Sequence, residues 1–236
     1  MKAMILAAGR GERMRPLSDG LPKPLLEAGG KPLIVWQIER LVAAGCADIV
    51  VNVSHRSEMI AVALGDGSRF GATVRYSREP EPLEVAGGIA TALPLLGDDL
   101  VLVVSGDVYA EYNYASLSAR AIAMRATAAP PHLHMVMVPN PPYHPDGDFT
   151  LTGERLALDG ALRQTFGNVA VYRTALFRDL PRGEKLPMLP LYRDWIGRGW
   201  ASGELHRGLW ANVGTPDELA RLDQLLRSTS RESSPL

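Results

Sequence analysis

Cysteine and net charge are both scarce in this chain of 236 residues, and each shortage excludes a class of protein. The only cysteine is Cys46, so the chain cannot build a framework of internal disulfides or a zinc site of several cysteines. The formal net charge is −1, so no overall field attracts nucleic acid or an anionic membrane. We therefore expect neither as a partner, and any bound anion must be held by a local cluster of cations.

Long apolar runs are also missing. No stretch approaches the roughly 20 consecutive apolar residues that a transmembrane helix needs. A signal peptide needs a longer apolar region than the one at the start of the chain, and it needs a cleavage site. Here four charged side chains follow the apolar start at once: Arg10, Glu12, Arg13 and Arg15. We expect a cytoplasmic protein, and a single reduced cysteine is compatible with that compartment.

Length and composition fit one folded domain. Hydrophobic residues make up 46% of the chain and charged residues 22%, which is ordinary for a globular protein. No internal repeat or low-complexity linker divides the sequence. We expect a single domain over residues 1–226, followed by a serine-rich, disordered tail over residues 227–236.

Strand and helix patterns alternate along the first half of the chain. Strands are predicted over residues 3–7, 49–53, 73–76 (an edge strand) and 100–104, and helices over 58–64, 87–96 and between Lys31-Pro32 and Gly45. The apolar run from Leu100 to Val104 is the strongest of these strands. Such alternation predicts an α/β fold of the Rossmann-like, doubly wound kind, with a mostly parallel mixed sheet and helices on both faces.

The pattern is looser in the second half. Strands are predicted over residues 132–138 and 169–172, separated by a stretch rich in Pro, Gly and Asp from 139 to 153. Helices are predicted over 186–196 and 216–226. The second helix has Thr215 as its N-cap and Pro216 in its first position.

A glycine-rich, basic segment from Leu6 to Pro16 follows the first predicted strand. Small residues after a buried strand let backbone N–H groups approach a ligand closely, and such loops bind phosphate oxygens. Arg13 and Arg15 add positive charge where a polyphosphate would lie. Lys23 stands between two prolines, which stiffen its backbone. The segment therefore predicts a phosphate-binding site.

Neither common class of phosphate loop matches this segment. A Walker A loop ends in Gly-Lys-Ser/Thr, and the dinucleotide fingerprint needs a third glycine where this chain has Met14. A Rossmann-type oxidoreductase that binds nicotinamide is disfavoured for the same reason.

Asp107 follows the strongest predicted strand, in Ser105-Gly106-Asp107. Ligands of parallel sheets bind at the carboxyl ends of the strands. One carboxylate together with substrate phosphates is the usual protein share of a magnesium site. Asp107 is therefore the candidate ligand of a Mg²⁺ cofactor.

The pattern L-A-A-G-x-G-x-R-M-x-P, followed by P-K-P-L, resembles the signature of the sugar-phosphate nucleotidylyltransferases. The resemblance covers most of the chain and implies a glycosyltransferase-A-like nucleotidyltransferase fold. It implies that Arg13 and Lys23 neutralise phosphate charge and that Asp107 holds the metal. It also implies that the nucleoside triphosphate is held by the residues of the loop, namely Leu6, Ala7, Ala8, Gly9 and Gly11.

Two later segments resemble further motifs of this family. Leu83-Glu84-Val85-Ala86-Gly87-Gly88 is similar to the segment that packs against the base, which implies that Glu84 and Gly88 bind nucleotide, although Val85 replaces the usual threonine. Trp210-Ala-Asn212-Val-Gly-Thr215 is similar to W-x-D-x-G-T, in which the aspartate is the second magnesium ligand. Asn212 stands at that position and offers an amide oxygen without charge. We expect weaker metal binding there, or one ligand fewer.

Three further residues lie where the family contacts the sugar phosphate: Asp148, Asn168 and Lys185. For each of them a plain surface loop is an equally good interpretation.

The reaction implied by the resemblance joins a nucleoside monophosphate to a sugar 1-phosphate and releases pyrophosphate. Glu12, in G-E-R-M-R-P-L, resembles the N-acetylmuramate 1-phosphate uridylyltransferase branch, which implies UTP as the nucleotide and a role in cell-wall (peptidoglycan) recycling. Other pairs stay open, such as GTP with mannose 1-phosphate, a glucose 1-phosphate, or CTP with phosphocholine. Asn212 also leaves open a catalytically weak nucleotide-binding homologue. The sequence does not distinguish a monomer from a homodimer.

Overall fold

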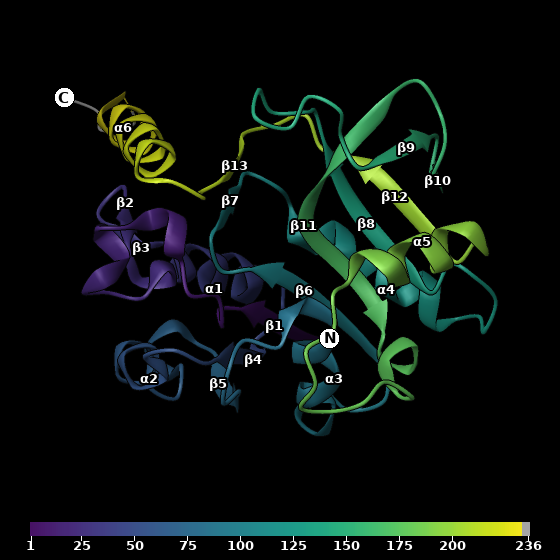
Figure 1. Cartoon of the computed structure of the whole chain (residues 1–236), viewed down its shortest axis with the longest axis horizontal. Coiled ribbons are helices and arrows are strands. Elements are labelled where there is room, and N and C mark those ends of the chain that lie inside the picture. The colour runs from purple at the N-terminus through teal and green to yellow at the C-terminus, as the bar shows by residue number, and fades with distance from the viewer. Residues whose placement is uncertain (233–236) are drawn as a thin grey trace.

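A nine-stranded mixed sheet organises the chain in the computed structural model, which describes residues 1–232 (Figure 1). The strand order is β5-β4-β1-β6-β11-β8-β12-β10-β9. Strands β5 (Thr73–Arg78), β4 (Asp48–Val53), β1 (Lys2–Leu6) and β6 (Leu100–Ser105) are neighbours and run parallel. All four match predicted strands, and β5 lies at the edge as expected.

Helices cover both faces of the sheet, which confirms the predicted fold class. On one face pack α1 (Leu33–Ala43), α2 (Ser57–Leu64) and α4 (Tyr114–Arg125). On the other face pack α3 (Glu84–Leu96) and α5 (Leu189–Gly197). Alternation along β1 shows why, since Ala3 and Ile5 belong to the first core and Met4 to the second. A central strand buried on both sides reads as a continuous apolar run.

The second half of the chain extends the same sheet in mixed directions. Strand β11 (Arg163–Arg173) runs antiparallel to both β6 and β8 (Leu133–Val138), and β12 (Ala201–Leu205) runs parallel to β8. Strands β9 (Phe149–Thr152) and β10 (Arg155–Ala157) complete the far edge. A bulge between Phe166 and Ala170 interrupts the pairing of β11 with β8.

Two short ladders and several single turns of 3-10 helix surround the main sheet. Strand β7 (Val108–Ala110) pairs with β13 (Trp210–Asn212), and β2 (Glu27–Ala28) pairs with β3 (Lys31–Pro32). The 3-10 turns are η1 (Glu12–Met14), η2 (Leu17–Asp19), η3 (Lys23–Leu25), η4 (Ser68–Phe70) and η5 (Thr174–Phe177).

Helix α6 (Pro216–Glu232) closes the chain beside β2, at one side of the molecule in Figure 1. Thr215 accepts the backbone N–H of Glu218 at 3.3 Å, which confirms the predicted N-cap. Residues 227–232, expected to be disordered, instead continue the helix, because Arg227 pairs with Asp223 one turn earlier at 2.8 Å. The rest of the predicted tail, residues 233–236, lies outside the described residues. Across residues 1–232, we find no helix that is both long and apolar enough to cross a membrane.

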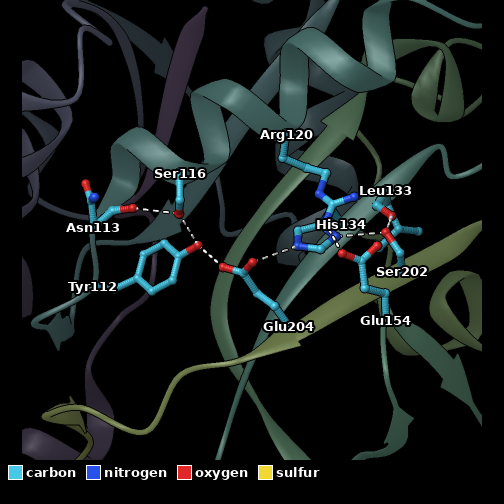
Figure 2. A network of polar contacts seen from close by, with 9 residues as sticks. All are labelled: Tyr112, Asn113, Ser116, Arg120, Leu133, His134, Glu154, Ser202 and Glu204. Carbon is cyan, nitrogen blue, oxygen red and sulfur yellow. Dashed lines mark hydrogen bonds and ion pairs between the residues drawn. The ribbon is translucent and has the colours of Figure 1, made fainter.

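A polar network ties α4 to strands β8 and β12 (Figure 2). The hydroxyl of Tyr112 donates to Glu204, whose other carboxylate oxygen lies 3.5 Å from Nε2 of the fully buried His134. Nδ1 of that histidine lies 2.8 Å from the hydroxyl of Ser202. Ser116 joins the network at Tyr112, 2.7 Å away. Contacts to His134 and Tyr112 hold the pKa of the Glu204 carboxyl below its usual value.

Replacing this carboxylate is expected to cost stability in a pH-dependent way. A depressed pKa means that the contribution of Glu204 is complete above its unfolded pKa and is lost as pH falls through the folded one. At pH 7 the variant Glu204→Gln is expected to lower the free energy of unfolding by about 1–3 kcal/mol, the scale for hydrogen bonds to charged groups. Urea unfolding at pH 7 and at pH 3 measures both values, and the difference from wild type should shrink at the lower pH.

Glu154→Gln is the matched control, because Glu154 pairs with Arg120 on the exposed edge of the same network. An exposed ion pair contributes about 0–1 kcal/mol. Equal losses in the two variants at pH 7 would contradict the role assigned to Glu204.

Candidate active site

Two loops from distant parts of the sequence meet at the carboxyl ends of β1 and β6. These strands are parallel neighbours in which Leu6 is in register with Ser105. The backbone N–H of Gly106 donates to the carbonyl of Leu6 at 2.9 Å. A Cβ at position 106 would lie 3.1 Å from that carbonyl oxygen, which is closer than most such contacts, so glycine favours this approach. As a result, Asp107 lies beside the predicted phosphate loop.

The loop after β1 is open on one side and braced on the other. A Cβ at Gly9 would meet nothing within 4 Å, so the backbone is accessible there. Gly11 has φ +65°, a conformation that favours glycine, and a Cβ there would lie 3.0 Å from Cβ of Lys23. The hydroxyl of Ser18 donates to the carbonyl of Gly11 at 2.8 Å. The loop is therefore held in one shape with an exposed backbone, as phosphate binding requires.

A cleft of about 740 Å³ lies over this loop. Charged side chains of both signs line it in equal number, four cations and four carboxylates. Its lining residues are Gly9, Arg10, Gly11, Glu12, Arg13, Lys23, Glu81, Pro82, Glu84, Asp107, Lys185 and Gly214.

Lys23 and Asp107 form an ion pair inside this cleft. The lysine begins η3 between its two prolines and is largely buried, whereas the carboxylate keeps 28% of its side chain exposed. Because the pair is partly shielded from water, its charges act more strongly than on an open surface. The structure thus brings together two of the three residues predicted to be catalytic.

Arg13, the third, reaches the cleft from η1. If Gly214 had a Cβ, that atom would lie 3.2 Å from Nη2 of Arg13 and 3.1 Å from Oε2 of Glu218, so both charged groups lie beside this glycine. That carboxylate accepts the N–H of Gly214 at 2.6 Å. The start of α6 therefore places the guanidinium of Arg13 at the rim of the cleft.

A second cavity of about 300 Å³ opens from the cleft towards α3. It contains four residues predicted to bind nucleotide, Leu6, Ala8, Gly9 and Glu84, and its lining is completed by Asn52, Glu79, Pro82, Val85, Ser105 and Asp107; Gly9, Pro82, Glu84 and Asp107 are shared with the cleft. Three predicted residues do not line it. Gly11 lines only the cleft. The side chain of Ala7 is buried in the core, and Gly88 packs behind the cavity wall, where a Cβ would lie 2.9 Å from both Asn52 and Glu79.

Glu84 begins α3 with φ +62°, and Lys185 lines the cleft beside it. A left-handed conformation is uncommon for a residue other than glycine, and such residues concentrate at functional sites. Nζ of Lys185 is 3.8 Å from Oε1 of Glu84. A backbone hydrogen bond holds the loop that carries Lys185 against the start of α3: the N–H of Leu186 donates to the carbonyl of Leu83 at 3.0 Å.

A third cavity, of about 450 Å³, contains the other residues predicted to contact the sugar. Asp148 accepts the backbone N–H of Phe166 at 2.8 Å and lies 3.1 Å from Nε2 of His144. Asn168 has φ +58°, at the bulge of β11. Aromatic side chains supply much of the wall, and the full lining is Tyr143, His144, Asp148, Phe149, Thr165, Phe166, Asn168, Leu189, Tyr192, Trp210 and Asn212.

Asn212 lies in this third cavity rather than in the cleft with Asp107. The backbones of the two residues are nonetheless close in space, because the N–H of Val213 donates to the carbonyl of Asp107 at 2.9 Å. Tyr143 lies beside Asn212; burial raises the pKa of its phenol, and the amide of Asn212 acts in the opposite direction.

The donor set suits a hard cation that is held mainly by its substrates. Within residues 1–232 no three His, Cys, Asp or Glu side chains gather in a way that could hold a metal ion. Asp107 offers a partly exposed carboxylate at the cleft, and Asn212 offers an amide oxygen nearby. Magnesium is commonly bound by one or two carboxylates together with phosphates and water, so these residues fit it.

Sequence reasoning missed Asn52 and Glu79, both buried at the second cavity. Asn52 interrupts the apolar run of β4, and an amide inside a buried strand is a signal that could have identified it. Glu79, two residues before Glu81, follows β5 directly, where other site residues follow β1 and β6.

Comparisons with known proteins agree with this geometry. Residues 2–141 match the family model described as "Nucleotidyl transferase". The chain is 46% identical over 221 residues to the N-acetylmuramate alpha-1-phosphate uridylyltransferase of Neisseria meningitidis serogroup B, covering 91% of this chain and 94% of that protein. It is 44% identical over 122 residues to a mannose-1-phosphate guanyltransferase of Schizosaccharomyces pombe, covering 50% of this chain and 34% of that one.

Solved structures share the fold at lower identity. A Bacillus anthracis protein assigned as a glucose-1-phosphate thymidylyltransferase superposes with a TM-score of 0.84 at 19% identity, over 96% of this chain and 95% of that one. HddC from Yersinia pseudotuberculosis, complexed with GMP-PN, superposes with a TM-score of 0.74 at 19% identity, over 95% and 98%.

Alanine at the two glycines of the loop should separate folding from ligand binding. Gly11→Ala forces a side chain into a left-handed backbone against Lys23, so we expect the free energy of unfolding to fall by about 1–3 kcal/mol. Gly9→Ala meets no neighbour and should fold normally, yet its methyl group stands in the cleft and should weaken binding of a nucleoside triphosphate. Urea unfolding and calorimetric titration measure the two effects.

Gly20→Ala is the control, since a Cβ there meets open space and φ is −103°. It should change neither quantity. Wild-type nucleotide affinity in Gly9→Ala would show that the loop backbone does not contact phosphate.

Proposed function

The chain belongs to the nucleotidyl transferase family, and we propose that UTP and N-acetylmuramate 1-phosphate are the two substrates of its sugar-1-phosphate nucleotidyltransferase activity. The observation that carries this proposal is the position of Asp107. It pairs with Lys23 in the cleft and also lines the cavity towards α3, and its carbonyl accepts the N–H of Val213, the residue after Asn212 of the third cavity. The cavity towards α3 accepts the nucleoside, the cleft accepts the phosphates, and the aromatic cavity beside β11 accepts the sugar. Identity of 46% to the uridylyltransferase, almost end to end, supports the choice of substrates.

The chemistry requires positioning and charge neutralisation, and it requires no protein nucleophile. An oxygen of the sugar 1-phosphate attacks the α-phosphorus of UTP. As that bond forms, the bond from the α-phosphorus to the oxygen bridging to the β-phosphorus breaks, and its electron pair leaves with pyrophosphate. Holding the two anions in line supplies much of the catalysis of such transfers.

The cations of the cleft are divided between the reacting groups. Lys23, the most buried of them, pairs with Asp107, which lines both the cleft and the nucleoside cavity, so Lys23 is assigned to the α-phosphate and the attacking phosphate. Arg13, which lines the cleft beside Gly214, is assigned to the departing pyrophosphate, which its planar fork suits. Lys185 meets the sugar phosphate at the mouth of the cleft. The open backbone around Gly9 and Gly11 donates N–H groups to the triphosphate.

A divalent cation would complete the charge balance. The four cations of the cleft are matched by four carboxylates, so the cleft has no excess positive charge for the roughly six negative charges on the phosphates of the two substrates. Asp107 would hold Mg²⁺, with Asn212 as an uncharged second donor. The ion supplies neutralisation of the phosphate oxygens.

The sugar cavity suits a ring with polar substituents. Phe149, Phe166 and Tyr192 offer apolar surface to one face of a pyranose. Asp148 and Asn168 face the same space with hydrogen-bonding groups. We assign the product, a nucleotide-linked muramic acid derivative, to the recycling of peptidoglycan, in a soluble cytoplasmic enzyme.

Two other functions have specific support. The mannose-1-phosphate guanyltransferases match half of the chain at 42–44% identity, which favours GTP with mannose 1-phosphate as the second candidate. Asn212, which removes a charge beside the cleft, favours a nucleotide-binding homologue with little activity.

A screen of pyrophosphate release from four nucleoside triphosphates against several sugar 1-phosphates separates these candidates. We expect release with UTP and N-acetylmuramate 1-phosphate in the presence of Mg²⁺, at a rate well above that of any other pair. Fastest release with GTP and mannose 1-phosphate would overturn the substrate assignment. Tight binding of UTP without release in any pair would favour the homologue of little activity.

Removing the central ion pair should lower turnover severely. We expect Lys23→Ala and Asp107→Asn each to reduce kcat by about 100-fold or more, the scale for groups that stabilise developing charge. In contrast, Asn212→Asp should lower the Mg²⁺ concentration needed for half-maximal rate, because a carboxylate replaces a neutral amide. Lys31→Ala, whose lysine pairs with Glu39 away from the cleft, is the control and should leave kcat unchanged. Normal turnover by Asp107→Asn would disprove its assignment as the metal ligand.

A further inference from the structure

A chain of three buried hydrogen bonds connects the phosphate loop to the start of α3. The N–H of Ala7 donates to Oδ1 of Asn52 at 2.8 Å. Nδ2 of Asn52 donates to Oε1 of Glu79 at 2.7 Å, and Oε2 of Glu79 accepts the N–H of Leu83 at 3.0 Å. The two side chains in the middle are only 3% and 5% exposed.

The ends of this chain belong to the two segments that enclose the nucleoside cavity. Ala7 lies between Leu6 and Ala8, which line one wall, and Leu83 directly precedes Glu84, which lines the other. Strands β4 and β5 supply the middle and are themselves rigid parallel neighbours, with the N–H of Glu79 donating to the carbonyl of Val53 at 2.8 Å. The hydrogen bonds therefore fix the width of the cavity.

The packing behind the pair leaves it no room to move. A Cβ at Gly88 would lie 2.9 Å from Nδ2 of Asn52 and 2.9 Å from Oε1 of Glu79, so the backbone of α3 presses directly on both groups. Gly88, predicted to bind nucleotide, thus contacts the pair that spans the cavity rather than the cavity itself.

The three hydrogen bonds restrict which pairs of functional groups can stand at positions 52 and 79. Ala7 and Leu83 both present N–H groups, so the two side chains between them must supply two acceptors at the ends and one donor–acceptor contact in the middle. A carboxylate provides acceptors only, and an amide provides one acceptor and one donor group, so an amide next to a carboxylate is the combination that satisfies all three bonds. Burial raises the pKa of Glu79, while the bonds from Leu83 and Asn52 favour its ionised form.

We infer that Asn52 and Glu79 are positioning residues that set nucleotide affinity by holding Ala7 and Leu83 at the spacing a bound nucleoside needs. This inference rests on the proposed function, which places the nucleoside in that cavity. The two residues act before the chemical step, because the reacting phosphates lie at Lys23 and Asp107. Their loss is therefore felt in the binding of nucleotide and not in turnover at saturation.

Exchange of the two functional groups tests this inference. Glu79→Gln sets an amide NH₂ against either Asn52 or the N–H of Leu83, and Asn52→Asp sets two carboxylates side by side. Each single variant should raise KM for UTP by about 10- to 100-fold, through an unsatisfied buried donor in Glu79→Gln and through repulsion of two buried carboxylates in Asn52→Asp, with kcat within about threefold of wild type.

The double variant N52D/E79Q exchanges the amide and the carboxylate and restores every donor and acceptor. The new carboxylate at position 52 accepts from the N–H of Ala7 and from the new amide at position 79, and the oxygen of that amide accepts from the N–H of Leu83. Its KM for UTP should therefore return to within about threefold of wild type, since no buried polar group is left unsatisfied.

Ser77→Ala is the matched control. Ser77 is a buried polar residue on β5 in register with Asn52, but it is not part of the chain of bonds, so its KM should equal that of wild type. Thermal unfolding of every variant shows the loss of fold stability separately from the loss of affinity.

The possible results separate the inference from the proposed function. Wild-type KM in both folded single variants, or no recovery in the double variant, would overturn the inference while the proposed function stands. Failure of the wild-type protein to bind UTP in calorimetric titration would overturn both. If a single variant does not fold, Glu79→Asp carries the test, because it keeps the charge but is too short to reach both donors. A raised KM with unchanged kcat is then expected, and a wild-type KM would refute the inference.

Discussion

The contact of Gly106 with the carbonyl of Leu6 determines the layout of the whole site. This hydrogen bond follows the last paired residues of the parallel strands β1 and β6, and the backbone leaves the sheet just beyond the end of each strand. Because parallel strands end at the same edge, a loop near residue 9 and a carboxylate at residue 107 become neighbours. A side chain at position 106 would crowd the carbonyl of Leu6 at the point where the loops diverge. The cleft and the cavity towards α3 both include Gly9 and Asp107, which lie just beyond this junction.

The proposed function assigns the two substrates to strands of different direction. The parallel strands β1, β4, β5 and β6 carry or directly precede the predicted phosphate loop, the buried Asn52–Glu79 pair and Asp107, which are proposed to meet the nucleotide. The antiparallel β11, with its bulge at Asn168, forms the sugar cavity. The family match over residues 2–141 falls mainly on the first group. The family shares the transfer of a phosphate-linked group. Because the proposed sugar cavity is built from a later part of the chain, its residues can differ without altering the phosphate loop.

Local sequence patterns were sufficient for the parallel half of the fold. Runs such as Leu100–Val104 are buried on both faces and are recognisable by composition. Strand β12 is not, because Ser202 and Gly203 lie inside it and its burial comes from neighbours far along the chain. The same limit applies to the site. Glycines and basic residues beside a strand indicated the phosphate loop, whereas the partnership of Asn52 with Glu79 follows from the pairing of β4 with β5 and has no local signature.

The charges of the cleft explain how the site can be ordered before substrate arrives and can exchange its ion pair when substrate binds. Lys23 and Asp107 neutralise one another across the junction, so a buried ammonium group is not left unpaired before substrate arrives. A bound phosphate would compete with Asp107 for the lysine, and a divalent cation would compete with Lys23 for the carboxylate. The two exchanges would assist each other, because each would free the partner that the other requires. Nucleotide and metal are therefore expected to bind cooperatively, and a neutral Asn212 makes this coupling depend on Asp107 more heavily than a second carboxylate would.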